Sequence, residues 1–247
     1  TGKNPADYET ILTRKNATTN TIERILGQPY ANNPYNSACV DYKSALWDGF
    51  TLQGGAINSK SLTQNGRNGG AGAAIYKNVI LRNCVVTDNV LYNSAYDTSG
   101  SGGYGRAGGV YLDGGSIINC YVINNSNTGY STSGNTSYGV CYGGGVYMYS
   151  GTMYNSVIAK NKVKARWAEG AGVFMEEGFF FNNTIIGNEA ECNSRARGSG
   201  GISIWCNASG GKNLFVFNSI SLDNIGNYNQ ALGDKNISVT TNGVINC

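Results

Sequence analysis

The chain has 247 residues, of which 36 are Gly and 3 are Pro, and only 13% are charged. This length allows one elongated domain with a continuous core, and 40% apolar content at such low charge excludes a disordered chain. The formal net charge of +3 is scattered and the apolar runs are short, which excludes a nucleic-acid surface and direct membrane insertion.

The first 45 residues form the least regular part of the chain. Short apolar segments at 10–12, 22–26 and 47–52 predict strands of early coils. Residues 19–27 favour a short capping helix as an alternative, with Asn20 or Thr21 at its start and Gly27 at its end. We therefore expect one domain over 1–247, with irregular coils or a cap at 1–45 and regular coils at 46–247.

An internal repeat occupies the rest of the chain. Five segments align, at 73–89, 108–125, 144–161, 171–188 and 200–224, each with a small-residue pair, a short apolar strand and an Asn. That first Asn is Asn83, Asn119, Asn155, Asn182 or Asn218, at intervals of 36, 36, 27 and 36 residues. Six residues later stands a second one, at Asn89, Asn125, Asn161, Asn188 or Asn224. Asn fills 33 of 247 positions, so five matches at one offset indicate a true repeat.

These repeats predict an all-β fold, a single-stranded right-handed parallel β-helix. Short strands that are apolar at alternate positions cannot bury a face alone, but stacked copies about 4.8 Å apart can. The inward ladders are expected to hold Val110, Val146, Val173 and Ile202, with Leu112, Met148, Met175 and Ile204 beside them. Asn stacked at the bends would satisfy peptide groups there, and Gly would supply the positive φ that bends need.

The last residues, 243–247, echo 81–84, and the chain begins at Thr1-Gly2 rather than at Met. Both features lead us to expect a piece cut from a longer chain, with any export signal outside it.

The cysteines indicate packing rather than metal binding. Seven are present, with no C-x-x-C and no His, so no metal site and no cofactor are predicted. Cys84 and Cys120 occupy equivalent positions on consecutive coils and should point inward, reduced and shielded from water. Backbones near 4.8 Å apart lie at the short end of what a disulfide accepts. Cys192 and Cys206, which we expect in loops, are better candidates for a disulfide.

Two motifs are similar to those of known β-helix families. Residues 47–55, Trp-Asp-Gly-Phe-Thr-Leu-Gln-Gly-Gly, resemble a coil common in pectin-lyase-like bacterial proteins. Gly-Gly-Val at 108–110 and 144–146, alternating with apolar-x-x-Asn, is similar to polymorphic outer-membrane-protein repeats and to Bacteroides-type surface proteins. The resemblance covers about residues 45–247 and implies a β-helix, export and a cell-surface or secreted location. One departure is Ser221, which replaces an apolar residue in the fifth coil.

The resemblance implies no catalytic residue. Lyases and hydrolases of this superfamily act on the outer face of one sheet with carboxylates and often His, Arg or Lys. This chain has no His, no Asp-Asp pair and no Asp-rich loop of the kind that holds calcium.

The outer face of the Gly-Gly-Val strand carries the candidate site. Alternation should place one column, Tyr76, Tyr111, Tyr147 and Phe174, outside the coil, and Asp113, Tyr149, Glu176 and Trp205 in the next. Exposed aromatic residues beside carboxylates predict a platform for a sugar chain along the solenoid axis. The alternative is that the aromatic ladder packs beneath loops 90–107 and 126–143.

Three functions remain open from the sequence. The first is an adhesion or carbohydrate-binding module without catalysis, with a glycan or a host or neighbour-cell surface as partner. The second is a polysaccharide-active enzyme, a lyase or glycoside hydrolase, in which Asp113 and Glu176, two coils apart, would act as the carboxylates. The third is a structural stalk.

Overall fold

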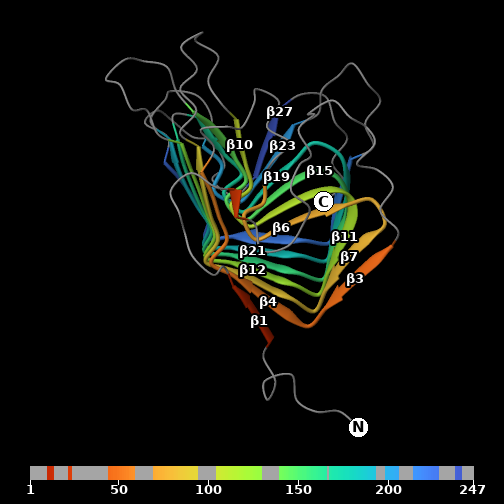
Figure 1. Ribbon diagram of the computed structural model, residues 1–247. Helices are drawn as coiled ribbons and strands as arrows, with labels where there is room; N and C mark the ends of the chain where they lie inside the picture. The colour runs from red at the N-terminus through yellow and green to blue at the C-terminus, as the bar shows by residue number, and fades with distance from the viewer. Residues whose placement is uncertain are drawn as a thin grey trace.

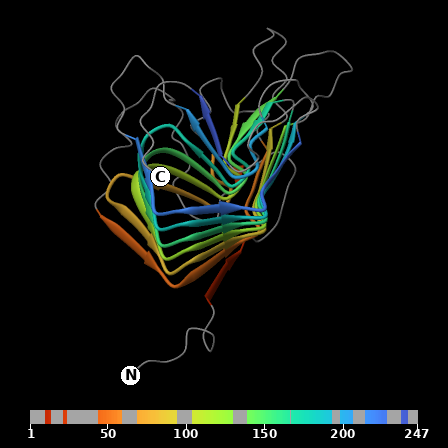
Figure 2. The same ribbon diagram turned by 180° about the vertical axis from the view of Figure 1, so that it is seen from behind.

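The computed structural model describes residues 10–13, 22–23, 44–58, 69–93, 104–129, 139–165, 167–192, 198–205, 214–227 and 237–240. Within these residues the regular structure is β-strand, which confirms the all-β prediction. The strands stack, in parallel with one exception near the N-terminus, into sheets that run across successive coils (Figures 1 and 2). The protein is therefore a parallel β-solenoid. Its right-handed sense stays a prediction, in line with the general rule for parallel crossovers. No helix of the described part is long and apolar enough to cross a membrane.

Four sheets are formed by the described residues, and we call them A to D. Sheet A contains β1 (Thr10–Thr13), β4 (Phe50–Gln53), β8 (Val85–Thr87), β12 (Tyr121–Ile123), β16 (Val157–Ala159), β21 (Thr184–Ile186) and β25 (Ile220–Leu222). Sheet B contains β2 (Ile22–Glu23), β5 (Ala56–Asn58), β9 (Val90–Asn93), β13 (Ser126–Gly129), β17 (Lys162–Ala165), β22 (Glu189–Cys192) and β26 (Ile225–Asn227).

Sheets C and D form the side that carries the candidate site. Sheet C contains β3 (Ala45–Asp48), β6 (Ala73–Tyr76), β7 (Val79–Arg82), β11 (Val110–Ile118), β15 (Val146–Tyr154), β19 (Val173–Met175), β20 (Gly178–Phe181), β23 (Ile202–Trp205), β24 (Leu214–Phe217) and β27 (Ile237–Thr240). Sheet D contains β10 (Tyr104–Arg106), β14 (Val140–Tyr142) and β18 (Trp167–Glu169). Sheet D immediately precedes sheet C in each of its coils.

Near the N-terminus the strand expectations are confirmed where residues are described. β1, β3 and β4 form at the segments predicted as early strands. Ile22 and Glu23 pair with β5 in antiparallel fashion, so the capping-helix alternative is wrong for these two residues. The remainder of 19–27 lies outside the described residues, as does the echo at 243–247.

The predicted inward ladders form the core. Val110 pairs in register with Val146, and Val146 pairs with Val173. The adjacent ladder aligns Leu112 with Met148 in the same way. All the predicted members are buried in one cluster, where they pack with inward residues of sheet A such as Val86, Val122 and Ile158. Stacking therefore removes from water the apolar face that no single coil could bury.

The bend from sheet C into sheet A relies on Asn rather than on Gly. The first Asn of every repeat has positive φ, at Asn83 (51°), Asn119 (52°), Asn155 (51°), Asn182 (55°) and Asn218 (47°). The expectation that Gly would supply this conformation is therefore wrong at this corner, except at Gly49. It is confirmed at the bend from sheet D into sheet C, where Gly143 and Gly170 have positive φ. Asn tolerates the left-handed region because its short polar side chain can hydrogen-bond locally.

The second Asn of each repeat stacks at one corner, as predicted. Asn89, Asn125, Asn161, Asn188 and Asn224 are all buried. Each side-chain oxygen accepts hydrogen bonds from the preceding coil, as when Asn161 Oδ1 accepts from the backbone N–H and Nδ2 of Asn125, both at 3.0 Å. The ladder thus satisfies buried peptide groups where the strands turn.

The Gly-Gly pair lets the bend between sheets D and C lie against the first residues of strands in sheet B. A Cβ on Gly144 would stand 2.5 Å from the carbonyl oxygen of Lys162, and a Cβ on Gly108 would stand 2.2 Å from that of Ser126. Only a residue without a side chain fits so near another backbone. The chain can therefore turn sharply from sheet D into sheet C, and this turn decides what covers the outer face of sheet C.

Candidate functional site

The first predicted column is buried, and the expectation that it is exposed is wrong. Tyr111, Tyr147 and Phe174 have no solvent-exposed surface. Their rings stack, with centroids 5.6 Å apart for Tyr111 and Tyr147 and 5.2 Å apart for Tyr147 and Phe174. Ala107, Val140 and Tyr142, at or next to sheet D, pack over them in a second hydrophobic cluster. The alternative, a ladder packed beneath 90–107 and 126–143, is confirmed for these rings.

Tyr76 belongs to the second column rather than the first. β6 pairs with β11 so that Ala74 lies beside Tyr111, and Tyr76 lies beside Asp113. The repeat alignment placed the small-residue pair before this strand at 73–74. The strand pairing instead puts that pair at 71–72, two residues earlier. The first column accordingly continues into Ala74 at one end and Ser203 at the other.

The second column alternates aromatic rings with carboxylates along five coils. Its order is Tyr76, Asp113, Tyr149, Glu176 and Trp205. A register shift after Leu112 pairs Asp113 with Ser150, so Tyr149 is an extra residue at this point of the ladder. Tyr76, Asp113, Tyr149 and Trp205 are each half-buried, so part of every side chain meets solvent. These four residues, and not the buried Glu176, are the part of the predicted platform that stays accessible.

Glu176 connects the two columns. Its side chain is buried and accepts a hydrogen bond from the Tyr147 hydroxyl. Burial, the first cause, raises the pKa of Tyr147 well above its ordinary value, and the neighbouring carboxylate adds to the shift. The Tyr147 hydroxyl therefore stays protonated and remains a donor to Glu176 at neutral pH.

Arg106, the last residue of β10, brings positive charge to this cluster. Its guanidinium carbon lies 4.9 Å from the centre of the Tyr147 ring. Burial lowers the pKa of Arg106, but Tyr147, Tyr111 and Glu176 around it raise that pKa on balance. The guanidinium therefore keeps its charge, and a cation over a ring and near a carboxylate holds sheet D against sheet C.

An exposed aromatic surface that we did not predict lies on the other half of sheet C. We call it the ring ladder: Tyr154, Phe179, Phe181, Phe215 and Phe217. Phe179 stacks on Phe215 with centroids 5.0 Å apart and an interplanar angle of 3°, and the two rings are 45% and 41% exposed. Tyr154, Phe181 and Phe217 stack at the same 5.0 Å spacing.

A period-two signal could have revealed this surface. Phe179 and Phe181 flank the inward Phe180, and Phe215 and Phe217 flank the inward Val216. The repeat is defined by the first strand of each coil, whereas the ring ladder lies on the second strand. Because neighbouring rings stack face to face, each covers part of its neighbour's face, which leaves less ring face for a sugar.

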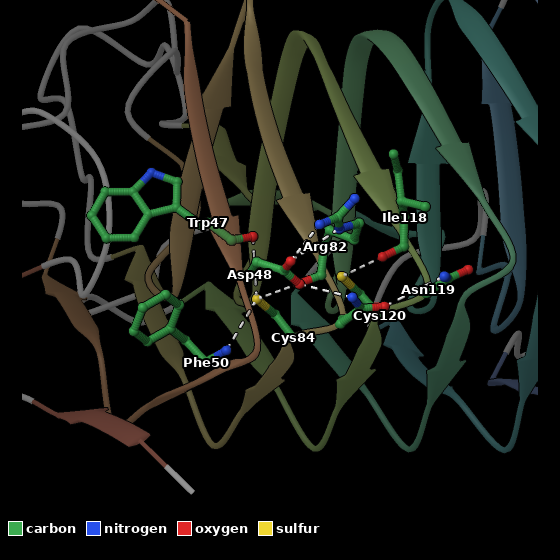
Figure 3. A network of polar contacts seen from close by, with 9 residues as sticks. Trp47, Asp48, Phe50, Arg82, Cys84, Ile118, Asn119 and Cys120 are labelled. Atoms are coloured by element: carbon green, nitrogen blue, oxygen red, sulfur yellow. Dashed lines mark hydrogen bonds and ion pairs between the residues drawn. The ribbon is translucent and has the colours of Figure 1, made fainter. Parts of the chain in front are cut away.

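Cys84 and Cys120 lie where they were predicted. Both are buried thiols, and they stand on neighbouring coils at the corner between sheets C and A (Figure 3). Cys84 Sγ accepts a hydrogen bond from the Phe50 N–H at 3.4 Å. On the solvent side of the same corner, Asp48 binds Arg82 and Asn83, an exposed polar group (Figure 3).

The described residues also show the surroundings of metal-ligating side chain types, of Cys192 and of Ser221. No cluster of three or more His, Cys, Asp or Glu side chains that could hold a metal ion occurs among them. Cys192 is the buried last residue of β22 and not a loop residue, and Cys206 lies outside the described part, so their pairing stays a prediction. Ser221 takes the inward position next to Ile185, where its hydroxyl accepts a hydrogen bond from Asn224 Nδ2 at 3.2 Å.

Comparison with known proteins identifies no relative. No family model, no curated protein and no solved structure matches the chain. The resemblance to pectin-lyase-like and outer-membrane-protein repeats therefore stays a prediction from the motifs, and the fold is what the structure establishes.

Proposed function

We propose that the chain is an exported, secreted or cell-surface β-solenoid module that binds a glycan or adheres to a glycan-bearing surface without catalysis. The observation that carries this proposal is the second column, in which Tyr76, Tyr149 and Trp205 alternate with Asp113 and Glu176. Aromatic rings stack on the apolar faces of sugars, and carboxylates accept hydrogen bonds from their hydroxyl groups.

The spacing of the column favours an extended ligand. Rings on every second coil stand about 10 Å apart, twice the ~4.8 Å strand spacing. Asp113 is held by Ser150, whose hydroxyl donates to Asp113 Oδ1 at 3.0 Å, and Glu176 is held by Tyr147. Carboxylates held by neighbouring side chains lose little freedom on binding, which favours a ligand lying along the solenoid axis.

A glycan-array screen tests the proposal. Wild-type protein is expected to bind a limited set of glycans, and Tyr149→Ala and Trp205→Ala are expected to lose that binding. Tyr121→Ala is the matched control, because Tyr121 is an exposed tyrosine on sheet A, away from the column. Equal loss in all three variants, or no binding by the wild type, contradicts the proposal.

The enzyme alternative rests on one observation, the presence of Asp113 and Glu176 in the same column two coils apart. Their backbones are about 10 Å apart by strand spacing, so the carboxyl groups can approach the 6.5–9.5 Å separation of inverting glycosidases. A reducing-sugar release assay on the bound glycans decides between the two. Release abolished by Asp113→Asn and by Glu176→Gln would establish the enzyme, and we expect no release.

A further inference from the structure

The outward side of the second half of sheet C forms a continuous surface over β3, β7, β11, β15, β20 and β24, which we call the ladder face. Its residues lie in two columns that follow the strand pairing. The first column contains Leu46, Ile80, Ser116, Thr152, Phe179 and Phe215. The second column begins with Asp48, Arg82 and Ile118 and ends in three rings of the ring ladder. The face is therefore aliphatic and polar at its N-terminal end and aromatic at its C-terminal end.

The apolar part of the ladder face is well exposed to solvent. Leu46 is 53% exposed and Ile80 is 37% exposed, while Phe179, Phe215 and Phe217 are each exposed by 41–45%. Applied to about 200 Å² for each whole side chain, these fractions leave about 400 Å² of apolar area in water. Contiguous apolar patches of several hundred Å² mark interaction sites on soluble proteins.

The full extent of the ladder face suits a stable protein–protein complex. The half-buried Ile118, Tyr154 and Phe181 and the exposed first Asn of each repeat, at the edge of the face, raise its accessible area to about 800 Å². A stable interface of standard size buries about 800 Å² on each partner. The ladder face alone can therefore supply one side of such an interface.

The charges on the ladder face allow a second copy of the same face as partner. Among the described outward residues of its six strands, Asp48 and Arg82 are charged, and they form an ion pair with each other (Figure 3). The whole chain has a formal net charge of +3, but the ladder face is neutral. Two copies can therefore meet there without like-charge repulsion.

We infer that two copies of the chain dock through their ladder faces, related by a two-fold axis that runs parallel to the strands. The two solenoid axes are then antiparallel, the two sheets pack about 10 Å apart, and every contact occurs twice. Because the first strand of one face lies opposite the last strand of the other, Leu46 lies on the partner's Phe215. By the same count, Ile80 lies on the partner's Phe179.

The antiparallel arrangement pairs large side chains with smaller ones. It sets the aromatic end of each copy on the aliphatic end of the other, whereas parallel axes would set the rings against their own copies at one end. Arg82 lies opposite the partner's Phe181, where its guanidinium can pack on the ring and keep its ion pair with Asp48. Size and charge along the face therefore both favour the antiparallel dimer.

Sedimentation velocity at increasing protein concentration tests the inference. Wild-type protein is expected to form a dimer that dissociates on dilution. Ile80→Lys and Phe179→Glu should each raise the dimer dissociation constant by about tenfold or more, because each sets a charge against an apolar side chain of the partner. An equimolar mixture of the two variants should recover a dimer, because the new lysine of one copy then meets the new glutamate of the other.

Tyr121→Glu is the matched control, because it places the same charge on an exposed ring of sheet A and should leave the dimer unchanged. Circular dichroism checks that all variants fold. A wild type that stays monomeric at every concentration overturns the inference, and flotation of that monomer with phosphatidylcholine vesicles would assign the face to a lipid surface. Dimers unaffected by Ile80→Lys and Phe179→Glu overturn the assignment of the face. Weak dimers of both variants without recovery in the mixture overturn the antiparallel arrangement.

Discussion

Asn125 Oδ1 accepts two hydrogen bonds from Asn89 on the preceding coil, one from its backbone N–H at 3.1 Å and one from its Nδ2 at 2.9 Å. Asn125 Nδ2 in turn donates to the carbonyl oxygen of Val86 at 2.9 Å. One buried side chain therefore satisfies backbone groups of a neighbouring coil on both sides of a turn.

Replacing Asn125 with Ala should destabilise the protein by about 3 kcal/mol, because it leaves a buried N–H and a buried C=O without partners. Urea unfolding followed by circular dichroism measures the change. Ser116→Ala, on the half-buried outer face of sheet C, is the control and should stay within about 0.5 kcal/mol of wild type. Equal effects of the two changes would contradict the structural role of the Asn ladder.

Asn155 tests the left-handed corner. Its φ is 51° and its side chain is exposed. Asn155→Gly should change stability little, while Asn155→Val should cost about 1–2 kcal/mol, since a β-branched side chain clashes with its own backbone there. Thermal unfolding of the two variants side by side checks the order. A valine variant as stable as the glycine variant would be incompatible with the assigned conformation.

The buried and accessible tyrosines should separate stability from binding. Tyr147→Ala removes a fully buried ring and is expected to cost about 3–5 kcal/mol of unfolding free energy. Tyr149→Ala should cost far less stability and weaken glycan binding by about 1–2 kcal/mol, the scale of one aromatic contact. Calorimetric unfolding and binding titration measure the two effects. The proposal fails if Tyr149→Ala binds as tightly as wild type.

The ring ladder offers a matched pair of neighbours. Phe180→Ala should cost about 3–5 kcal/mol because this ring fills the core. Phe179→Ala, one residue away, should cost about 1 kcal/mol because its exposed ring loses only the stack with Phe215. Chemical unfolding of both variants measures the difference. Similar losses would place Phe179 in the core and contradict its outward position.

The Cys84–Cys120 pair should make stability depend on pH in two opposite ways. The pKa of Cys84 is lowered to about 7 from its ordinary 9, so its contribution is full above pH 9 and is lost as pH falls through 7. The pKa of Cys120 is raised, so above pH 9 the unfolded chain releases that proton first and stability falls again. Unfolding midpoints from pH 6 to 10 under reducing conditions should therefore pass through a maximum near pH 9. Cys84→Ser should abolish the rise of the unfolding midpoint between pH 7 and 9. A wild-type midpoint that does not change with pH would contradict the opposite pKa shifts of the two thiols.

The sequence determined the repeat, and the repeat determined the coil. Asn125 and its equivalents could be assigned to one corner because each turn needs the same backbone groups satisfied. Val110 and Leu112 could be assigned to the core because alternation in a strand leaves one face for stacking. Cys84 and Cys120 followed from the same periodicity. These features depend on local conformation and on the identity of successive coils, which a single sequence displays.

Only the tertiary structure decided which outer surfaces are covered. Tyr111 and Tyr147 alternate with inward residues as any outward pair would, and nothing local shows that Val140 and Tyr142 of sheet D pack over them. Tyr76 likewise changed column because a register depends on which strand pairs with which. Burial of an outer face is set by contacts between segments distant in the chain, here brought together where glycines such as Gly144 allow two backbones to approach.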